Sequence, residues 1–382
     1  MKLIRVEVIM SLQMLVMLWR IMVFWYDPYV DPRNNYLTIE ALENGLTASL
    51  STNACEYCVD GDGNWKTLAA GNATESINSG QTLSFRGNLT PQSYKGIGTF
   101  TISKKCNLKG NCMSMLFKDN AANSFSLSDK DYAFYELFKN CNNIISISKS
   151  FLPATTLEYY CYYKMFYNCT SLTTAPELPA TTLATDCYSS MFNGCTNLTT
   201  TPELPATTLK DGCYDSMFYN CTSLTTAPEL PATTLIKTCY DGMFSGCTSL
   251  TTAPALPATT LQRNCYNSMF QGCTSLTTAP ELPATALASN CYYRMFKGCT
   301  SLTTAPELPA ATLLDYCYYE MFYDCSKLNY IKMLATDISG MECLRGWLNS
   351  VSRTGTFVKN AAMTSLKRGA SGIPDGWTLQ NA

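Results

Sequence analysis

The chain repeats itself every 26 residues, and this period constrains the fold more than any other feature. Each unit reads C-Y-x-x-M-F-x-x-C-T-S-L-T-T-A-P-E-L-P-A-T-T-L-x-x-x. Degraded copies begin at Cys112, Ala133 and Cys343, so about ten turns with irregular ends are expected. The regular units begin at Cys161, Cys187, Cys213, Cys239, Cys265, Cys291 and Cys317. Such a period predicts a solenoid, in which each unit packs on its neighbours and atypical end units act as caps.

The first part of each unit has the spacing of a short amphipathic helix. Thr182 is a suitable N-cap for it, and Gly194 marks its expected end. The apolar residues of one unit fall on one half of a helical wheel: Leu183, Cys187, Tyr188, Met191, Phe192 and Cys195. We therefore expect one helix per turn, with its cysteines facing the core.

The second part of each unit predicts a short strand followed by an extended return. The run "SLTTA" has strand propensity, and Pro176 stops it because proline cannot donate to a ladder. Leu178 and Leu183 are expected to turn inward as the chain crosses back. Parallel stacking of these strands gives a rise of about 4.8 Å per turn, and roughly 50 Å for ten turns. The repeated threonines then form a ladder on the sheet face.

Twenty cysteines in 382 residues pose a chemical question, because the repeat could be a metal or redox site. The chain has no histidine, which excludes histidine-based triads and the usual catalytic zinc sites. The nearest repeated carboxylate, Glu177, becomes Ala255 in another unit. The favoured interpretation is a column of reduced core thiols, with disulfides and metal binding as alternatives. The structural thiols are Cys161, Cys169, Cys187, Cys195, Cys213, Cys221, Cys239, Cys247, Cys265, Cys273, Cys291, Cys299, Cys317 and Cys325.

Residues 36–105 have a different sequence pattern. Short segments in which apolar and polar residues alternate are separated by Gly, Asn and Asp clusters. They predict a small antiparallel β domain, most simply a sandwich. A lone CxxC lies here at Cys55 and Cys58, and only Cys106 and Cys112 could complete a metal site with it. The favoured reading is again structural thiols.

Residues 1–30 form an apolar N-terminal segment. Lys2 and Arg5 precede an apolar run, and residues 8–26 could anchor the chain in a membrane, although Arg20 would lie inside the span. The same segment could instead be a signal sequence that directs export of the chain. The alternative is an upstream extension, with translation beginning at Met22.

At "MFYNCTSLTTAPELPATTL" the chain resembles the BspA-like leucine-rich-repeat surface proteins of Bacteroidales type. The resemblance covers residues 112–345, and it leaves residues 346–382 as a C-terminal cap. It implies an α/β leucine-rich-repeat solenoid with one short parallel strand and one short helix per turn, behind the small antiparallel β-sandwich-like domain. It also implies a secreted or cell-surface protein that adheres to host or cell-surface partners, with no catalytic residues in the array.

The expected function is therefore non-catalytic binding or adhesion to a protein or glycan at a cell surface, without a cofactor. A phage or mobile-element tail or head fibre, located in the virion, is the alternative. With 27 basic and 29 acidic side chains and no basic stripe, nucleic acid is not an expected partner. An enzyme would need the β domain, where Asp60, Asp62 and Glu75 could serve glycoside chemistry. The run "DGDGN" could instead bind calcium, but it lacks the downstream bidentate glutamate, and an Asp-Gly turn accounts for it more simply.

The candidate contact surface consists of tyrosines near the two ends of the array. Exposed tyrosine gives a large contact area at low entropic cost. These positions also vary from unit to unit, which is what drifting, solvent-facing positions would do without any partner. The candidate residues are Tyr159, Tyr160, Tyr163, Lys164, Tyr167, Tyr292, Tyr293, Tyr316, Tyr319 and Tyr323.

Overall fold

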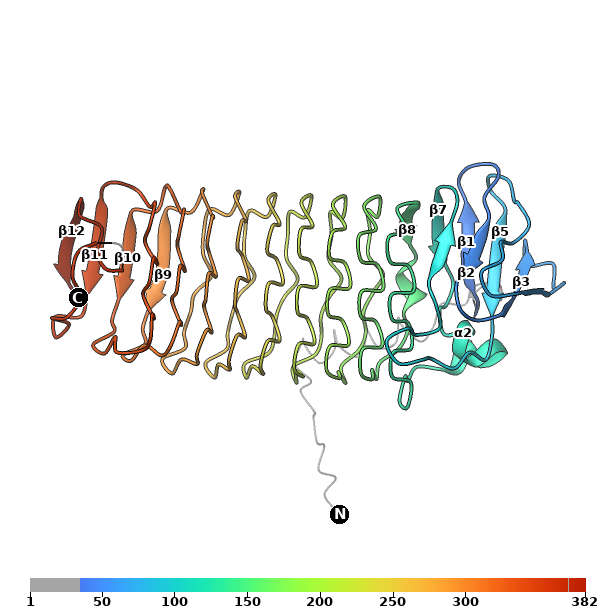
Figure 1. Ribbon diagram of the computed structural model, residues 1–382, viewed down its shortest axis with the longest axis horizontal. Coiled ribbons are helices and arrows are strands. Elements are labelled where there is room, and N and C mark those ends of the chain that lie inside the picture. The colour runs from blue at the N-terminus through green and yellow to red at the C-terminus, as the bar shows by residue number, and fades with distance from the viewer. Residues whose placement is uncertain (1–34, 370) are drawn as a thin grey trace, which may run out of the picture.

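The computed structural model describes residues 35–369 and 371–382. In this range the chain is an elongated stack of turns, with a β domain at its N-terminal end and a parallel sheet at its C-terminal end (Figure 1). The predicted anchor at 8–26 and the alternative start at Met22 lie outside the described residues. The described part contains no helix that is long and apolar enough to cross a membrane.

Seven strands make up the N-terminal β domain. They are β1 (Leu37–Ala41), β2 (Ala48–Leu50), β3 (Cys55–Val59), β4 (Lys66–Leu68), β5 (Thr82–Arg86), β6 (Phe100–Ile102) and β7 (Cys106–Lys109). One sheet has the order β4-β3-β5-β1-β7-β8, where β8 (Ile144–Ile147) belongs to the repeats, and β2 pairs separately with β6. All pairings among β1 to β7 are antiparallel, as the alternating pattern predicts.

The β domain is continuous with the repeat array. Strand β7 pairs with β8 in parallel, so the six-stranded sheet runs across the expected boundary between 36–105 and 112–345. The ring of Phe100 stacks on that of Phe138 at 5.3 Å and 11°. The β domain therefore covers the first turn, whose apolar side chains and backbone groups would otherwise face water.

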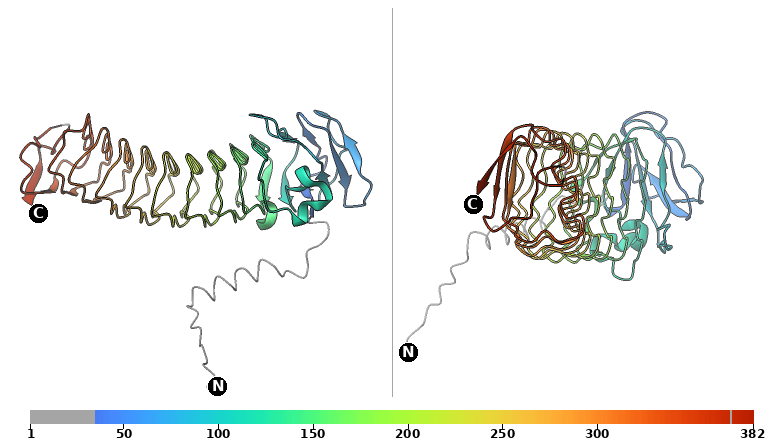
Figure 2. Two further views of the ribbon diagram at one scale, coloured as in Figure 1. Left: turned by 90° about the horizontal axis from the view of Figure 1, so that it is seen from below. Right: turned by 60° about the vertical axis from the view of Figure 1, so that its left-hand side comes forward.

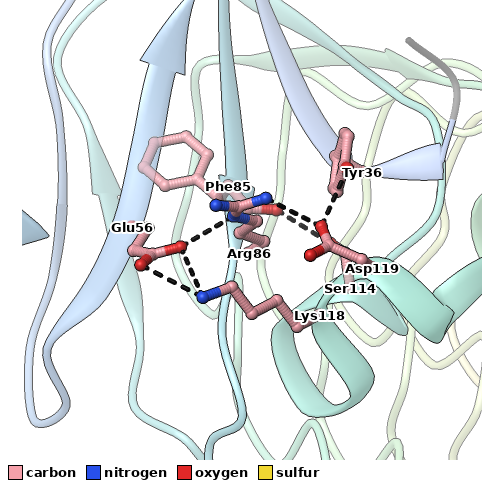
Figure 3. A network of polar contacts seen from close by, with 7 residues as sticks. All are labelled: Tyr36, Glu56, Phe85, Arg86, Ser114, Lys118 and Asp119. Atoms are coloured by element: carbon pink, nitrogen blue, oxygen red, sulfur yellow. Dashed lines mark hydrogen bonds and ion pairs between the residues drawn. The ribbon is translucent and has the colours of Figure 1, made fainter. Parts of the chain in front are cut away.

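Short helices and a polar network complete this junction (Figure 3). Helix α2 (Ser114–Phe117) is followed by the 3-10 helix η2 (Lys118–Asn123), and η3 (Lys149–Phe151) follows β8. The Arg86 guanidinium donates to Glu56 and to Asp119, with N to O distances of 2.7 Å each. Lys118 adds a second ion pair to Glu56. These groups retain contact with water, so each pair contributes at most about 1 kcal/mol, and their main effect is to fix the orientation of η2 on the sheet.

The expected helix in each repeat is wrong, because the segment between the two cysteines is a run of tight turns. Its backbone amides alternate between two kinds of partner. The amide of Tyr163 donates to the Tyr160 carbonyl three residues earlier, at 3.2 Å. The amide of Tyr162, one residue before, donates to the Cys187 carbonyl of the next turn, at 3.0 Å. An α-helix would use nearly all of these amides internally, whereas here every second one joins neighbouring turns.

A left-handed residue recurs at every fourth position of this segment. In one unit Asn264, Ser268 and Gly272 have φ values of 58°, 51° and 73°. The same three places have positive φ in all nine units between Tyr132 and Ser350. Because positive φ strains most L-residues, Gly, Asn, Ser and Asp dominate these places. Gly194, expected to end a helix, has one of them with φ 77°.

The predicted parallel strand is present but is reduced to single bridges in the middle of the array. Thr174 bridges Thr200, and Thr252 bridges both Thr226 and Thr278, all in parallel. A proline follows two residues after each of these threonines and has no N–H to donate, which limits the ladder. A second row of bridges includes Thr182, paired with Thr156, so Thr182 is not a helix cap.

Longer strands stack at the C-terminal end. They are β9 (Thr304–Leu308), β10 (Tyr330–Met333), β11 (Gly355–Lys359) and β12 (Trp377–Asn381), in the order β12-β11-β10-β9. Strand β9 contains Pro306 and pairs with β10 through a register shift, whereas the proline-free β10 and β11 pair without one. The indoles of Trp347 and Trp377 donate to the carbonyls of Gly372 and Ser352, so both buried tryptophans close this end with their N–H groups satisfied.

Two columns of stacked rings form the core. They run along the stack of turns that Figure 2 shows from two further directions. One column contains Tyr162, Tyr188, Tyr214, Tyr240, Tyr266, Tyr292 and Tyr318, with Phe134 before it and Trp347 after it. The other contains Phe138, Phe166, Phe192, Phe218, Phe244, Phe270, Phe296 and Phe322. These rings are nearly inaccessible to water, and burial of each phenylalanine stabilises the stack by about 2–3 kcal/mol. The gain is smaller for Tyr162 and Tyr214, whose buried hydroxyls have no hydrogen-bond partner among the described residues.

Candidate functional site

The side chains available to a partner lie on the outer edge of the turn segments. We define the outer edge by position relative to the first cysteine of each unit. It consists of the residue directly before that cysteine and the residues two, three, six and seven places after that cysteine. In the unit of Cys161 these are Tyr160, Tyr163, Lys164, Tyr167 and Asn168, which are all partly exposed. The residues between them, Cys161, Tyr162, Met165 and Phe166, are buried in the core. The four-residue turns thus alternate pairs of core residues with pairs of outer residues.

Six tyrosines gather where the array meets the β domain, and we call them the N-terminal tyrosine cluster. Tyr132 is at its centre, stacked on Tyr160 at 5.4 Å and 4.9 Å from the well-exposed Tyr94. Tyr135 stacks on Tyr163 at 5.0 Å. The full cluster is Tyr94, Tyr132, Tyr135, Tyr159, Tyr160 and Tyr163. The last three of these tyrosines were predicted from the sequence.

Tyr94, Tyr132 and Tyr135 were missed by the sequence analysis. A signal for two of them was present, because Tyr132 and Tyr135 occupy outer-edge places of the degraded unit that begins at Ala133. Tyr94 comes from the β domain, and nothing in the repeat pattern indicates that it would lie beside the array. Burial raises the pKa of Tyr135 to about 12, so its hydroxyl stays protonated and can donate at neutral pH.

Lysines flank this cluster. The Lys164 ammonium lies 4.9 Å from the ring centre of Tyr163 and 5.3 Å from that of Tyr167. Lys139 lies 5.9 Å from Tyr167 and pairs with Glu136 at 2.8 Å. Cations at these distances are attracted to the ring faces by about 0.5–1 kcal/mol at exposed sites. The structure thus brings the predicted residues Lys164 and Tyr167 to the border of the cluster.

A second group, the C-terminal tyrosine cluster, contains Tyr293, Tyr316, Tyr319 and Tyr323. Tyr293 stacks on Tyr319 with centroids 4.7 Å apart and planes within 6°. Arg294 lies 4.8 Å from the Tyr293 ring, and Lys297 lies 4.6 Å from the Tyr323 ring. Both cations extend toward the following turn, where they bind the same carboxylate.

That carboxylate belongs to Glu320. Lys297 donates to it at 2.7 Å and Arg294 at 2.9 Å. Partial burial alone would raise the pKa of Glu320, but the hydrogen bonds from the two cations hold it below its usual value. The group is therefore ionised at neutral pH, and it keeps Lys297 and Arg294 beside the tyrosines.

Tyr292 was predicted to belong to the contact surface, and this prediction is wrong. Its side chain is 2% exposed and forms part of the buried ring column between Tyr266 and Tyr318. It occupies the place next to the first cysteine, which is a core place in every regular unit. Its neighbour Tyr293, one residue later, is the outer residue.

Two aspartates occupy the middle of the outer edge, at the place that holds tyrosine near the ends. Burial, with the nearby charge of Asp186, raises the pKa of Asp215 to about 6. Burial and the charge of Asp215 raise the pKa of Asp241 to about 7. Hydrogen bonds from Ser216 and Asn267 favour the ionised forms but only partly offset these effects.

All twenty cysteines are buried and unpaired in the structure. The second cysteine of a unit does more than fill space, because its thiol donates to the phenylalanine carbonyl of the previous turn. Cys247 Sγ lies 3.1 Å from the Phe218 carbonyl oxygen. Burial raises the pKa of Cys247 to about 12, so the reactive thiolate is not populated at neutral pH. The described residues contain no group of three or more cysteine, aspartate or glutamate side chains suited to hold a metal.

Comparison with known proteins identifies the repeat. The family model "BspA type Leucine rich repeat region" matches residues 135–277 and 259–343, in six copies. These matches cover more than half of the 382 residues. The chain belongs to this family. No curated protein and no solved structure matches it. BspA-type repeats are generally scaffolds for protein interaction and surface adhesion, and are typically non-catalytic.

Outside the BspA-type repeats, the carboxylates of the β domain have separate partners. Asp60 accepts from Gln81 Nε2 and from the amide of Thr82, both at 2.8 Å. Asp62 accepts from the amide of Asn64, which is the Asp-Gly turn expected from the sequence. Glu75 pairs with Lys66.

The CxxC thiols lie in the same domain, on strand β3. Burial, with a contribution from the charge of Glu56, raises the pKa of Cys55 to about 12. Burial also raises the pKa of Cys58. Both thiols therefore stay protonated at neutral pH, as structural thiols do.

Proposed function

We propose that the chain is a non-catalytic adhesion protein, in which a solenoid with an N-terminal β-sandwich cap presents its outer edge to a protein or glycan at a cell surface. The observation that carries this proposal is the concentration of partly exposed tyrosines in two clusters, one near each end of the array. Tyrosine is enriched in binding hot spots, where it combines a large apolar area with a hydroxyl group.

The backbone of the array supports this use of the outer edge. Every second amide is bonded to the next turn, so the outer side chains project from a rigid framework. A preorganised surface pays less conformational entropy on binding than a mobile loop does. The family to which the chain belongs generally serves in interactions of this kind.

The test is the binding of labelled full-length chain to cells and to immobilised matrix proteins and glycans. Replacing Tyr94, Tyr159 and Tyr163 by Ser should reduce retention at least about tenfold if the cluster is a hot spot. Thr208→Ala, in the exposed threonine row, is the matched surface control and should bind as the unchanged chain does. Undiminished retention of the triple variant on every surface would remove the N-terminal cluster from the proposal.

A second candidate, a tail or head fibre of a phage or mobile element, fits the elongated shape of the molecule (Figure 1). A long stack of turns can act as a spacer between a particle and its receptor. Mass spectrometry of purified virions distinguishes the two, because a fibre protein would be found in the particle and an adhesin in the cell envelope or culture fluid.

A further inference from the structure

A shallow hollow of about 260 Å³ opens on the outer edge beside the C-terminal tyrosine cluster. Its lining consists of three amides and two phenols: Asn264, Asn267, Asn290, Tyr293 and Tyr316. We propose that this hollow binds a single neutral pyranose ring, stacked on the face of Tyr293. The inference rests on the proposed adhesive function and names the ligand class for one part of the contact surface.

The ring of Tyr293 is available on one side only. Its C-terminal side is covered by Tyr319, stacked at 4.7 Å. Arg294 also extends toward the following turn, where its Nε donates to Glu320 at 2.9 Å. The corresponding place one turn earlier holds the shorter Asn267, so the N-terminal side of the ring faces the hollow. The face of an aromatic ring is electronegative, and it attracts the weakly positive C–H groups on one face of a pyranose.

The three asparagines supply hydrogen bonds around this ring. Asn264 and Asn290 both have φ of 58°, and asparagine tolerates this left-handed conformation better than most residues. Asn267 is held in place, since its Nδ2 donates to Asp241 at 3.3 Å and its Oδ1 accepts from Ser268 at 2.8 Å. An amide both donates and accepts, as a sugar hydroxyl does.

Asn264 gives an independent indication of a missing partner. Its Oδ1 is buried and has no hydrogen-bond partner among the described residues. Such an unsatisfied group costs about 1–3 kcal/mol. Asn264 also lines the hollow, so its side chain is part of the wall that a ligand would contact. A ligand hydroxyl could then provide the hydrogen bond that the oxygen lacks.

Charge and size select the ligand class. None of the five lining side chains carries a charge at neutral pH. The neighbouring Arg294, 4.8 Å from the Tyr293 ring, is already paired with Glu320, so an ionised ligand would lose its hydration without gaining a free counter-charge. The volume is below the roughly 300–1,000 Å³ of pockets that enclose drug-sized molecules. One sugar ring therefore fits, with the rest of a glycan chain remaining in solvent.

Saturation-transfer-difference NMR on the full chain tests this with methyl glycosides of glucose, galactose, mannose and N-acetylglucosamine as probes. We expect saturable binding of at least one glycoside with a dissociation constant on the order of 1 mM, as suits a single ring in a shallow site. Saturation should be strongest on the C–H protons of one sugar face. Tyr293→Ala should weaken binding at least about tenfold, whereas Tyr293→Phe, which keeps the ring, should retain it.

Tyr330→Ala is the matched control, because Tyr330 is an exposed tyrosine on β10 and does not line the hollow. Circular dichroism melts establish that each variant is folded. The proposal is overturned if no glycoside binds saturably, or if Tyr293→Ala binds as tightly as the unchanged chain. Cell retention measured on the same samples separates the two proposals: retention without glycoside binding removes the sugar site alone, and glycoside binding without retention removes the adhesive function.

Discussion

At the scale of single residues, two aspartates on the outer edge reduce the stability of the folded chain. Asp215 and Asp241 occupy the same place in adjacent turns. Like charges stacked in neighbouring repeats repel each other, and partial burial adds a desolvation penalty. The repeat itself imposes this proximity, because each place in a unit lies directly against its counterpart. Asparagine in the next unit, Asn267, relieves the repulsion by donating to Asp241.

The Asp241→Asn substitution should stabilise the protein at high pH and leave it unchanged at low pH. The pKa of Asp241 rises from an ordinary value of 3.8 to about 7 on folding, so the folded state binds its proton more tightly. Its contribution to stability is full below pH 3.8 and is lost as the pH rises to 7. The full shift corresponds to about 4 kcal/mol. Because Asp241 is partly exposed, solvent screening reduces this, and we expect the difference in unfolding free energy between the variant and the unchanged chain to grow by about 1–2 kcal/mol between pH 4 and pH 8.

Urea denaturation at several pH values measures this difference. Asp211→Asn is the control, because Asp211 is a solvent-exposed carboxylate. A pH-independent effect of Asp241→Asn would show that this carboxylate has an ordinary pKa in the folded protein.

Cysteine illustrates why a residue type alone does not fix its role. A repeated C-x₇-C resembles a reactive or metal-binding device, yet each second thiol is a small buried group that also donates a hydrogen bond across turns. Serine would place a more strongly hydrated hydroxyl at the same site, and alanine would leave the carbonyl with one partner fewer. Cysteine combines small size, apolar character and a weak donor in one side chain.

At the scale of the element, the left-handed residues can be tested against the helix that the sequence suggested. Thr238 has φ of 55°, which is strained for a β-branched residue. Thr238→Gly should therefore raise the unfolding free energy by about 0.5–1 kcal/mol, since relief of strain exceeds the entropic cost of glycine. In a helix, the same change would instead be destabilising by about 0.3 kcal/mol.

Thr233→Gly supplies the comparison, because Thr233 is exposed in the same unit and does not have positive φ. It should lose about 0.5–1 kcal/mol of stability. Equal losses for the two variants, measured by chemical denaturation, would contradict the four-residue turn geometry.

The sequence predicted the inside of the repeat correctly but not its secondary structure. Cys187, Tyr188, Met191, Phe192 and Cys195 are all buried, as the helical wheel indicated. Pairs of apolar residues at intervals of four fit a 3.6-residue helix and a four-residue turn equally well over such a short segment. The signal that distinguishes the turns from a helix is the frequent Gly, Asn or Ser directly before each apolar pair. In a helix, these residues would be ordinary solvent-facing polar positions.

Predictions of the candidate site failed or fell short where contacts depend on chain segments far apart in the sequence. Tyr292 was assigned to the surface because tyrosines near the ends were considered together, although its place in the unit is a core place. Tyr94 was missed because it reaches the array from the β domain. Tyr159, Tyr160 and Tyr163 were found because their contacts are local to the repeat.

At the scale of the whole molecule, contacts between turns are nearly all between nearest neighbours. The ring columns, the threonine bridges and the alternating amides each connect one turn to the next. The unfolding free energy is therefore close to a sum of contributions from the single turns and from the interfaces between neighbouring turns. The two capped ends add contributions of their own. The β domain covers one end through Phe100, and Trp347 and Trp377 cover the other.

This organisation predicts that one complete turn can be removed without loss of the fold. Deleting residues 213–238 brings Cys239 into the place of Cys213, so both ring columns, Tyr188 to Tyr240 and Phe192 to Phe244, close again across the junction. The variant should be monomeric to the same extent as the unchanged chain, keep its circular dichroism spectrum, and lose only a few kcal/mol of unfolding free energy.

A deletion that breaks the period provides the control. Removing residues 213–237 takes away one residue fewer, so every later residue that should face the core is displaced by one place at the junction. Apolar places would then meet outer places, and the left-handed residues would no longer align with Gly, Asn or Ser. We expect this variant to aggregate or to unfold at much lower temperature, as measured by light scattering and thermal melts. If the two deletions behaved alike, the register between turns would not be what holds the array together.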